Sequence, residues 1–282
     1  MLFSIILATL NRSVEIKTCL QSLERQIEKD FEVIIVDQSE DDKTKDIVNK
    51  FKNLNIKYYN VPFTGLSRAR NYGIRQASGD YLCLADDDAV YSENYLLEAK
   101  VALNKYGKVI VSGKILNIVD RTTPFVEYNS KMNGRSLHAR NIVKFCPSAA
   151  LIIPREATLK IGGFNESLGV GNEYASGEET DYLLRLYDVG YKVYFYKDMI
   201  AYHPIKPVSS LDSIYKHYMG QGALFKIDFY KRRKMRLLSV ALKNTIGMLF
   251  KAYLLDQTNK DLYLTRNYGF IKGVQEFGEG DD

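Results

Sequence analysis

Cysteine is scarce in this sequence and tryptophan is absent. The three cysteines, Cys19, Cys83 and Cys146, are far apart, and none belongs to a C-x-x-C pair. Zinc sites and disulfide frameworks need more closely spaced or more numerous cysteines, so the sequence favours neither. Widely spaced thiols fit a reducing compartment, and we expect the protein to be cytoplasmic.

Long hydrophobic runs are also missing. No uninterrupted apolar segment reaches the roughly 20 residues that a helix needs to cross a bilayer. The apolar residues 1–7 lack a basic leader and run into Asn11 and Arg12, so we expect a buried strand there rather than a secretion signal. Hydrophobic residues still make up 46% of the 282 residues, which is enough for a large core.

The net charge narrows the class of ligand only a little. The formal charge of +5 suits an anionic partner such as a nucleoside diphosphate, a phospholipid surface or a nucleic acid. The charge alone does not choose among these three.

The first third of the chain alternates short apolar runs with segments of helical period. The runs predict strands at residues 3–8, 32–37, 56–61 and 81–85. This alternation predicts an α/β fold with a mostly parallel central sheet flanked by helices. In such sheets ligands bind beyond the carboxyl ends of the strands, where this sequence places polar side chains.

The remainder of the chain divides into a part with mixed strand and helix patterns and a part with helical pattern only. Residues 120–143 are polar and weakly periodic, and we interpret them as an insertion or mobile loop. Further strands are expected at 149–154, 192–196 and 200–203, with helices at 155–161 and 176–189. Beyond residue 206 the pattern becomes helical, at 211–229, 237–255 and 261–269. We therefore expect a catalytic domain of residues 1–206 and a helical C-terminal region of residues 207–282.

Three carboxylates, Asp86, Asp87 and Asp88, follow the predicted strand 81–85. Like charges so close together repel one another, and a hard divalent cation would offset that repulsion. An acidic surface turn explains the triplet alone about as well. The polar residues at the other strand ends favour the cation.

Two further elements could meet an anionic nucleotide. Asp37 ends the second predicted strand, where a carboxylate can accept hydrogen bonds from a ribose or a base, or can cap the next helix. Arg68 and Arg70 lie near a helix start and could face phosphate oxygens, although solvated arginines are more common.

The order of the motifs resembles that of family 2 glycosyltransferases over roughly residues 1–205. Five short segments carry the resemblance: Leu10-Asn11-Arg12, Val36-Asp37, the stretch GLSRARNYG at 65–73, Asp86-Asp87-Asp88, and GEETD at 177–181. The resemblance implies a GT-A fold, in which a Rossmann-like nucleotide-sugar half (1–115) is joined to an acceptor half (116–206).

The resemblance also implies roles for particular residues. The donor would be bound by a set of polar residues from the nucleotide half: Thr9, Asn11, Arg12, Asp37, Arg68, Arg70, Asp86 and Asp87. Asp88 and Asp86 would form a D-x-D pair that holds Mn²⁺ or Mg²⁺, with the register open by one position. His203 would be a further metal ligand, although a lone histidine is more often structural.

On the acceptor side, the resemblance makes Glu179 the base that deprotonates the acceptor hydroxyl. The family more often has aspartate there, so Glu178 and then Asp181 remain alternatives. A structural rival is a capping box, since Ser176 precedes Glu179 by three residues. Asn172 and Glu173 would contact acceptor sugar hydroxyls.

The implied activity is a metal-dependent, inverting transfer of a sugar, expected to come from a UDP-sugar, to a glycan or lipid-linked glycan hydroxyl in polysaccharide biosynthesis. A sugar-phosphate nucleotidyltransferase is an alternative, but it needs a glycine-rich loop that residues 8–12 lack. A non-catalytic protein that binds a nucleotide-sugar or a nucleic acid is another, and we expect no nucleic-acid partner.

The C-terminal region suggests one more kind of partner. The basic run 231–236 precedes residues 237–255, an apolar stretch interrupted by Lys243 and Lys251. This pattern indicates an amphipathic helix that could lie peripherally on the inner face of the cell membrane. Packing on the catalytic domain, or on a second subunit in a homodimer, fits the pattern equally well.

Overall fold

The computed structural model describes residues 1–128, 132–205 and 210–278. The chain forms two compact units that alternate along the sequence. The first unit comprises Met1–Thr64, Arg68–Phe164 and Tyr182–Ile205. The second comprises Gly65–Ser67, Asn165–Asp181 and Lys206–Asp282.

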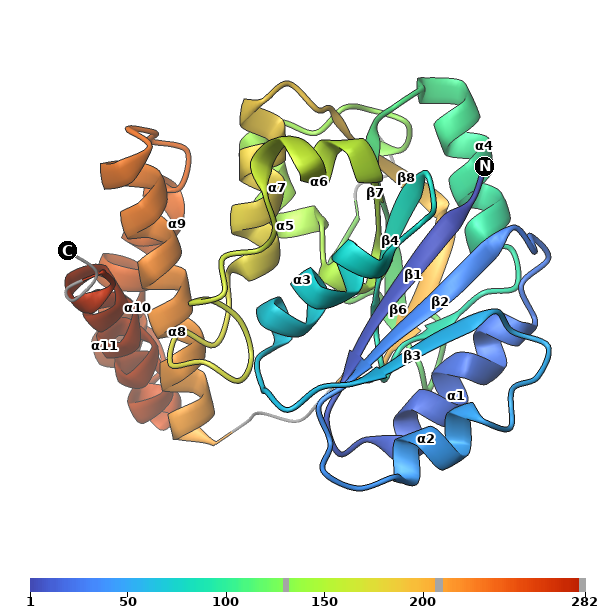
Figure 1. The fold of residues 1–282 in the computed structure, drawn as a ribbon. Coiled ribbons are helices and arrows are strands. Elements are labelled where there is room, and N and C mark those ends of the chain that lie inside the picture. Colours follow the sequence, from blue (N-terminus) through green and yellow to red (C-terminus); the bar gives the residue numbers. More distant parts are fainter. Residues whose placement is uncertain (129–131, 206–209, 279–282) are drawn as a thin grey trace. The chain divides into compact units, whose positions relative to one another are not determined.

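The first unit is built on one twisted sheet, in which the described residues supply eight strands (Figure 1). In chain order the strands are β1 (Phe3–Thr9), β2 (Phe31–Asp37), β3 (Ile56–Asn60), β4 (Tyr81–Asp86), β5 (Val90–Tyr91), β6 (Ile110–Asn117), β7 (Leu151–Pro154) and β8 (Val193–His203). Their spatial order is β3-β2-β1-β4-β7-β6-β8-β5. Strands β3, β2, β1 and β4 are parallel, β6 is parallel to β8, and β7 and β5 run antiparallel to their neighbours.

The register of these strands brings polar residues to one edge of the sheet. Thr9 pairs with Asp37, and Ala8 pairs with Asp86. On the other side of the sheet, Asn117 of β6 pairs with His203 of β8. Because parallel strands end at the same edge, the carboxyl ends of β1, β2 and β4 place these side chains close together.

Helices cover both faces of the sheet. The side chains of Phe3, Ile5 and Leu7 share a buried core with α1 (Ser13–Glu24) and α4 (Tyr95–Tyr106). On the opposite face, Gly73 of α3 (Leu66–Gln76) lies so close that a Cβ atom there would come 2.7 Å from Ile6 Cγ2. Glycine therefore permits the close approach of α3 to β1.

Shorter elements complete the first unit. They are α2 (Lys43–Val48), α5 (Ala139–Phe145), the 3-10 turn η2 (Ser148–Ala150) and α6 (Arg155–Ile161). Helix α7 (Glu178–Asp188) begins in the second unit and continues into the first.

The four early strands are confirmed within one or two residues at each end. The prediction of two strands at 192–196 and 200–203 was wrong, because β8 runs unbroken from Val193 to His203. Strand β6 was missed. Gly113 interrupts its apolar pattern and lies at a bulge where the pairing with β8 shifts. The stretch 120–143, expected to be an insertion or loop, contains the start of α5, and residues 129–131 lie outside the described residues.

The second unit is helical. Helices α8 (Leu211–Lys226) and α11 (Lys260–Glu276) pack with their backbones in close contact. A Cβ atom at Gly273 would lie 2.0 Å from the Met219 carbonyl oxygen, and one at Gly222 would lie 2.1 Å from that of Phe270. Only glycine fits at these two positions.

Between α8 and α11 the chain alternates α-helical and π-helical turns. These are η3 (Ile227–Lys231), α9 (Leu238–Leu242), η4 (Lys243–Gly247), α10 (Met248–Phe250) and η5 (Lys251–Leu255), followed by the 3-10 turn η6 (Gln257–Asn259). The helical character expected at 237–255 is therefore confirmed, and the π-helical turns are a feature that the sequence did not predict.

The segment Asn165–Asp181, which ends in the first turn of α7, packs on the helices of the same unit. Leu168 shares a small buried cluster with Ala223, Ile227 and Phe277. The last stretch of the first unit ends at Ile205. The predicted domains, with boundaries at residues 115 and 206, stay a prediction.

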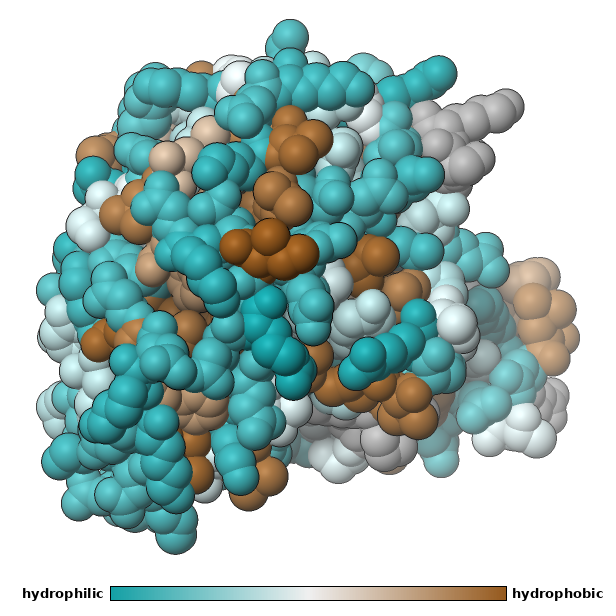
Figure 2. Space-filling model, turned by 90° about the vertical axis from the view of Figure 1, so that its right-hand side faces the viewer, coloured by the Kyte–Doolittle hydropathy of each residue, from teal (hydrophilic) through white to brown (hydrophobic). Residues whose placement is uncertain are grey.

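Hydrophilic residues cover most of the face shown in Figure 2, and hydrophobic side chains form smaller groups between them. Across the described part of the chain, no helix combines the length and the hydropathy needed to cross a membrane.

Candidate active site

The carboxyl edge of the sheet carries a group of side chains suited to a divalent metal. Asp86 ends β4, Asp88 follows it by two residues, and His203 ends β8. One ligand atom from each of these residues lies within 4.8 Å of the others. His203 Nε2 is 2.9 Å from Asp88 Oδ1 and 3.8 Å from Asp86 Oδ2. Two carboxylates and an imidazole form a donor set that fits manganese or a similar cation.

The orientation of His203 supports a ligand role. Its Nδ1 atom lies 3.0 Å from the Pro204 carbonyl oxygen, which can only accept, so Nδ1 carries the hydrogen and Nε2 faces the carboxylates. Burial lowers the pKa of His203. The hydrogen bond with Asp88 and the charges of Asp88 and Asp86 outweigh burial, so the pKa lies above its ordinary value.

Asp87 faces different partners from its two neighbours. It accepts a hydrogen bond from Thr9 Oγ1 (2.8 Å) and pairs with Arg12 Nη1 (2.6 Å). Arg12 also pairs through Nη2 with Asp88 Oδ2 (2.8 Å). Burial raises the pKa of Asp87 to about 6, against the opposing effects of Arg12 and Thr9. Asp87 therefore ties the β1 turn to the acidic triplet, while Asp86 and Asp88 face His203.

Arg70 is a buried partner of Asp86. Its side chain is only 1% exposed, and Nη2 donates to Asp86 Oδ1 at 2.9 Å. Ser148 contacts the same carboxylate, with its hydroxyl 3.3 Å from Asp86 Oδ1. Sequence reasoning named Arg70 but missed Ser148, which lies 62 residues from Asp86 in an apolar stretch without a motif.

Asp37 is fully buried, and both of its carboxylate oxygens are engaged. Oδ1 accepts from the Ser39 backbone N–H (2.9 Å) and hydroxyl (2.6 Å), and Oδ2 accepts from Tyr58 Oη (2.7 Å). The hydrogen bond to Asp37 adds to burial in raising the pKa of Tyr58. A carboxylate has about four lone-pair positions, and these three hydrogen bonds occupy most of those on Asp37. Tyr58 was missed, because it lies within a strand rather than at its end.

Two predicted donor residues lie on the surface. Arg68 is exposed, and its guanidinium stacks over the Phe63 ring at 4.2 Å. Asn11 is exposed with φ 55°, a left-handed conformation that asparagine tolerates, and its backbone N–H donates to Ser39 Oγ (2.8 Å). Asn11 thereby fixes the turn that carries Arg12 toward the aspartates.

The second unit has carboxylates of its own at the start of α7. Glu178 is 5% exposed and packs closely against Gly169, whereas Glu179 is half-buried. Asp181 is 1% exposed and forms an ion pair with Arg232. These environments distinguish the three candidate bases, because the Asp181 charge is already compensated and Glu178 is enclosed by the loop.

A capping box would direct the Ser176 hydroxyl to the backbone at the start of α7, but this hydroxyl has a partner in α8. The Ser176 hydroxyl donates to the His217 carbonyl oxygen of α8 at 2.6 Å. Gly220 of α8 lies against Ser176, where a Cβ atom would come 2.5 Å from the Ser176 carbonyl oxygen. Ser176 thus anchors the start of the acidic segment to α8.

Two residues of the basic run 231–236 form ion pairs with buried aspartates of the second unit. Arg232 pairs with Asp181 and lies 3.8 Å from Asp228, and Arg236 binds the fully buried Asp228 with Nη2 at 2.6 Å. The run suggested a basic surface, but two of its five cations neutralise buried carboxylates. Composition alone could not reveal this, because both aspartates lie outside the run.

The predicted acceptor residues lie in the loop of the second unit. The Asn172 side chain donates to the Leu168 carbonyl oxygen (3.2 Å), and Glu173 is exposed. Both are compatible with binding sugar hydroxyls, and their roles stay predictions, as do those of the other site residues.

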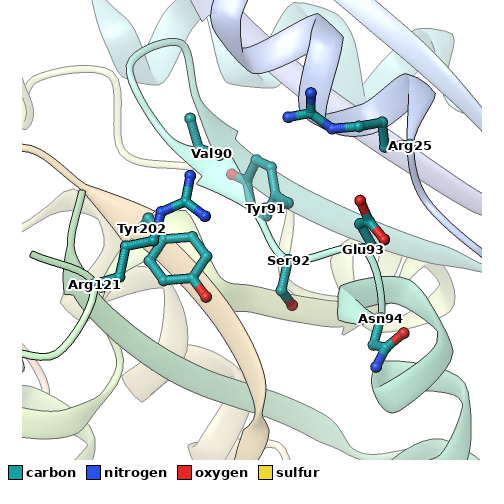
Figure 3. A pocket seen from close by; sticks show the side chains of 8 residues that line it. All are labelled: Arg25, Val90, Tyr91, Ser92, Glu93, Asn94, Arg121 and Tyr202. Carbon is teal, nitrogen blue, oxygen red and sulfur yellow. The ribbon is translucent and has the colours of Figure 1, made fainter. Parts of the chain in front are cut away.

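A cavity of about 500 Å³ lies in the first unit beside β5 and β8. Figure 3 shows the eight side chains that line it, among them Arg25, Arg121 and Tyr202, and the predicted site residues are not among these eight. The Arg121 guanidinium lies 5.0 Å from the Tyr202 ring centroid. Since side chains alternate along a strand, Tyr202 and His203 point to opposite faces of β8, which separates this cavity from the carboxylates that face His203.

Comparison with known proteins identifies relatives over most of the chain. Glycosyltransferase AglE of Haloferax volcanii is 27% identical over 259 residues, covering 88% of this chain and 81% of AglE. The poly(ribitol-phosphate) beta-N-acetylglucosaminyltransferase TarS of Staphylococcus aureus is 25% identical over 282 residues, covering 96% of this chain. The chain spans 45% of the length of TarS.

Solved structures share the fold. Residues 1–349 of S. aureus TarS in complex with UDP-GlcNAc match with a TM-score of 0.67 and 21% identity, over 97% of this chain and 82% of that one. The mannosyltransferase PcManGT from Pyrobaculum calidifontis, in complex with GDP-Man and Mn²⁺, matches with a TM-score of 0.67 and 15% identity, over 97% and 87% of the two chains. These likenesses confirm the expected GT-A fold.

The family model described as Glycosyl transferase family 2 matches residues 4–162, which include the whole acidic triplet and all of the four early strands except Phe3. The match covers more than half of the chain. Together with its relatives, this match shows that the chain belongs to glycosyl transferase family 2 and is a glycosyltransferase.

Proposed function

We propose that this glycosyltransferase moves a sugar from a UDP-sugar to a hydroxyl group of a glycan or lipid-linked glycan, with inversion at the anomeric carbon, in polysaccharide biosynthesis. The observation that carries the proposal is the convergence of Asp86, Asp88 and His203 within 4.8 Å at the carboxyl edge of the sheet. Ligands of open α/β sheets bind at this edge.

The nature of the donor is supported by the related structures. TarS was solved with UDP and with UDP-GlcNAc, and PcManGT with GDP-Man and Mn²⁺. All three ligands contain a nucleoside diphosphate. We choose uridine because TarS is also a relative by sequence along nearly the whole chain.

Asp86, Asp88 and His203 would hold the metal. A bound divalent cation acts as a Lewis acid that stabilises the charge developing on the departing diphosphate. Arg12 and Arg70 are cations fixed on the same aspartates, at 2.8 Å and 2.9 Å. Guanidinium groups held beside these carboxylates can also donate hydrogen bonds to the phosphate oxygens of the donor.

Inversion in a single displacement requires a base for the acceptor hydroxyl. We assign this role to Glu179. It occupies the motif position of the base, and its half-buried side chain can meet a ligand. Glu178 is enclosed, and Asp181 is bound by Arg232.

The donor half of the proposal is tested by thermal unfolding with UDP, GDP, dTDP and CDP, each with and without Mn²⁺. A ligand that binds only the folded state raises the unfolding temperature. We expect a manganese-dependent rise with UDP that is absent in Asp88→Asn. Asp42→Asn, which changes an exposed aspartate, is the matched control and should behave like the wild type.

Two outcomes would contradict this half of the proposal. One is that none of the nucleotides shifts the unfolding temperature of the wild type. The other is that UDP stabilises the wild type and Asp88→Asn equally, which would place the binding of the diphosphate elsewhere.

The catalytic half is tested with Glu179→Gln, which keeps the shape of the side chain and removes its basicity. We expect a loss of turnover of about 10²- to 10⁴-fold, the usual contribution of a general base, with the UDP-dependent thermal shift retained. Glu178→Gln is the control and should retain most of its activity. The configuration of the new glycosidic bond, measured by NMR, should be opposite to that of the donor, and a retained configuration would rule out the single displacement.

A further inference from the structure

The helical segment Leu238–Leu255 of the second unit is anchored along one side. Ala241, Met248 and Ala252 are buried. Asn244 donates to Gln221 of α8 (2.8 Å), and the Asn267 side chain of α11 donates to the Asn244 carbonyl oxygen (3.2 Å). These contacts fix which side of the segment faces the other helices of the unit.

The opposite side of this segment exposes an unusual number of large apolar residues, called here the apolar ridge. The ridge comprises Leu242 (49% exposed), Ile246 (67%), Leu249 (40%), Phe250 (50%), Tyr253 (53%), Leu254 (69%) and Leu255 (66%). Single exposed apolar residues are ordinary on protein surfaces, but Leu242, Ile246, Leu249 and Tyr253 recur every three or four residues and so share one side of the helix. Apolar residues gathered on one exposed side mark an interaction site.

The charges around the ridge all have one sign. Residues 229–255 contain seven lysines and arginines and no aspartate or glutamate. Arg232 and Arg236 neutralise the buried Asp181 and Asp228. The other five cations all have exposed side chains: Lys231, Arg233, Lys234, Lys243 and Lys251.

We propose that the apolar ridge and its exposed cations dock this protein on an anionic lipid bilayer. An amphipathic helix on a membrane inserts its apolar face at the headgroup boundary, and lysine and arginine beside that face attract anionic lipids. A second copy of the chain is a poorer occupant of the ridge, because two copies meeting there would bring the same unbalanced positive charges together. In the part of the chain that the structure describes, no helix is long and apolar enough to cross a membrane.

This inference does not depend on the identity of the donor, the metal or the base. It predicts a lipid-binding surface whether or not the acceptor is lipid-linked. Its test can therefore fail while the proposed activity stands, and the reverse is also true.

The test is co-sedimentation of the full chain with vesicles of phosphatidylcholine alone and with vesicles in which part of it is replaced by phosphatidylglycerol. We expect binding to the anionic vesicles that weakens as salt is added, since the cations act through screened electrostatics. Ile246→Ser/Leu254→Ser should reduce the affinity about tenfold or more, because two large apolar side chains no longer insert. Lys243→Glu/Lys251→Glu should reduce it similarly on anionic vesicles.

The matched control is Val119→Ser/Leu159→Ser, which changes two apolar residues of the first unit that are 86% and 75% exposed. This control should bind vesicles like the wild type. Thermal unfolding of each variant checks that it remains folded. We expect every variant to fold, because the substituted side chains are exposed.

Three outcomes would overturn the proposal. The first is that the wild type does not sediment with anionic vesicles. The second is that the folded ridge variant binds them as well as the wild type does. The third is that the wild type is a dimer that Ile246→Ser/Leu254→Ser converts to a monomer, which would assign the ridge to a second copy.

Discussion

The two edges of the sheet in the first unit both hold buried carboxylates, but the carboxylates have different hydrogen-bond and charge partners at the two edges. At the amino edge, Glu32 accepts from Ser4 Oγ (2.6 Å) and from the Ser78 N–H (2.7 Å) and hydroxyl (2.8 Å), and it pairs with Lys57 (2.7 Å). Burial raises the pKa of Glu32, but these contacts outweigh it and lower the pKa to about 2.

At the carboxyl edge the balance is reversed. Asp86, Asp87 and Asp88 share Arg12 and Arg70 as counter-charges, and the pKa of Asp87 is raised to about 6 by burial. The pKa of His203 is also raised, so this edge retains an attraction for positive charge. A carboxylate with a full set of donors stabilises the fold, whereas a group of carboxylates with too few counter-charges is suited to a ligand.

The largest effect should come from Asp88→Asn. Asp88 faces His203, and loss of its charge should abolish manganese binding and reduce turnover about a thousandfold, as removal of a group that stabilises transition-state charge does. Asp87→Asn should retain manganese binding, because Asp87 faces Thr9 and Arg12 instead. Manganese titration followed by electron paramagnetic resonance distinguishes the two variants. The reverse pattern would show that the metal pair includes Asp87.

Glu32→Gln should have the next largest effect, on stability rather than activity. The folded-state pKa of about 2 lies below the ordinary value of 4.5. The stabilisation is therefore complete above pH 4.5 and is lost as the pH falls toward 2. At pH 7 the variant should lose roughly 3 kcal/mol of unfolding free energy, with catalysis of the folded protein unchanged.

Urea unfolding at several pH values measures this loss. The difference between Glu32→Gln and the wild type should shrink between pH 4.5 and pH 2. A difference that does not change with pH would mean that the charge of Glu32 contributes little, and the contrast between the two edges would lose its basis.

The smallest effect is expected for Arg12→Ala. Arg12 places a positive charge 2.8 Å from Asp88, where it opposes a metal cation. Its removal should tighten manganese binding a few-fold, about 1 kcal/mol, because the site is only partly screened by solvent. Arg68→Ala is the control, since Arg68 is exposed and stacked on Phe63. Weaker manganese binding by Arg12→Ala would mean that Arg12 chiefly organises the ligands.

Much of the first unit follows from local pattern. The apolar runs of β1, β2 and β4 are buried along their length, so periodicity and turn residues located them. Strand β6 was not predicted because Gly113 and Lys114 interrupt its apolar pattern. Its pairing with β8, which stabilises the strand despite these two residues, exists only in the folded chain. The same limit applies to the π-helical turns η4 and η5, because sequence gives a helical period but not its local irregularities.

The sequence by itself determined that Thr9, Asp37 and the acidic triplet share one edge of a sheet, because parallel strands end together and these residues follow the strands directly. Only the tertiary structure decided which partners each carboxylate has. His203 reaches Asp88 from β8, Ser148 reaches Asp86 from η2, and Arg232 reaches Asp181 from the C-terminal helices. The physical reason is that local pattern sets the face of each strand or helix, whereas contacts between distant segments depend on strand register and helix packing, which the whole chain settles together.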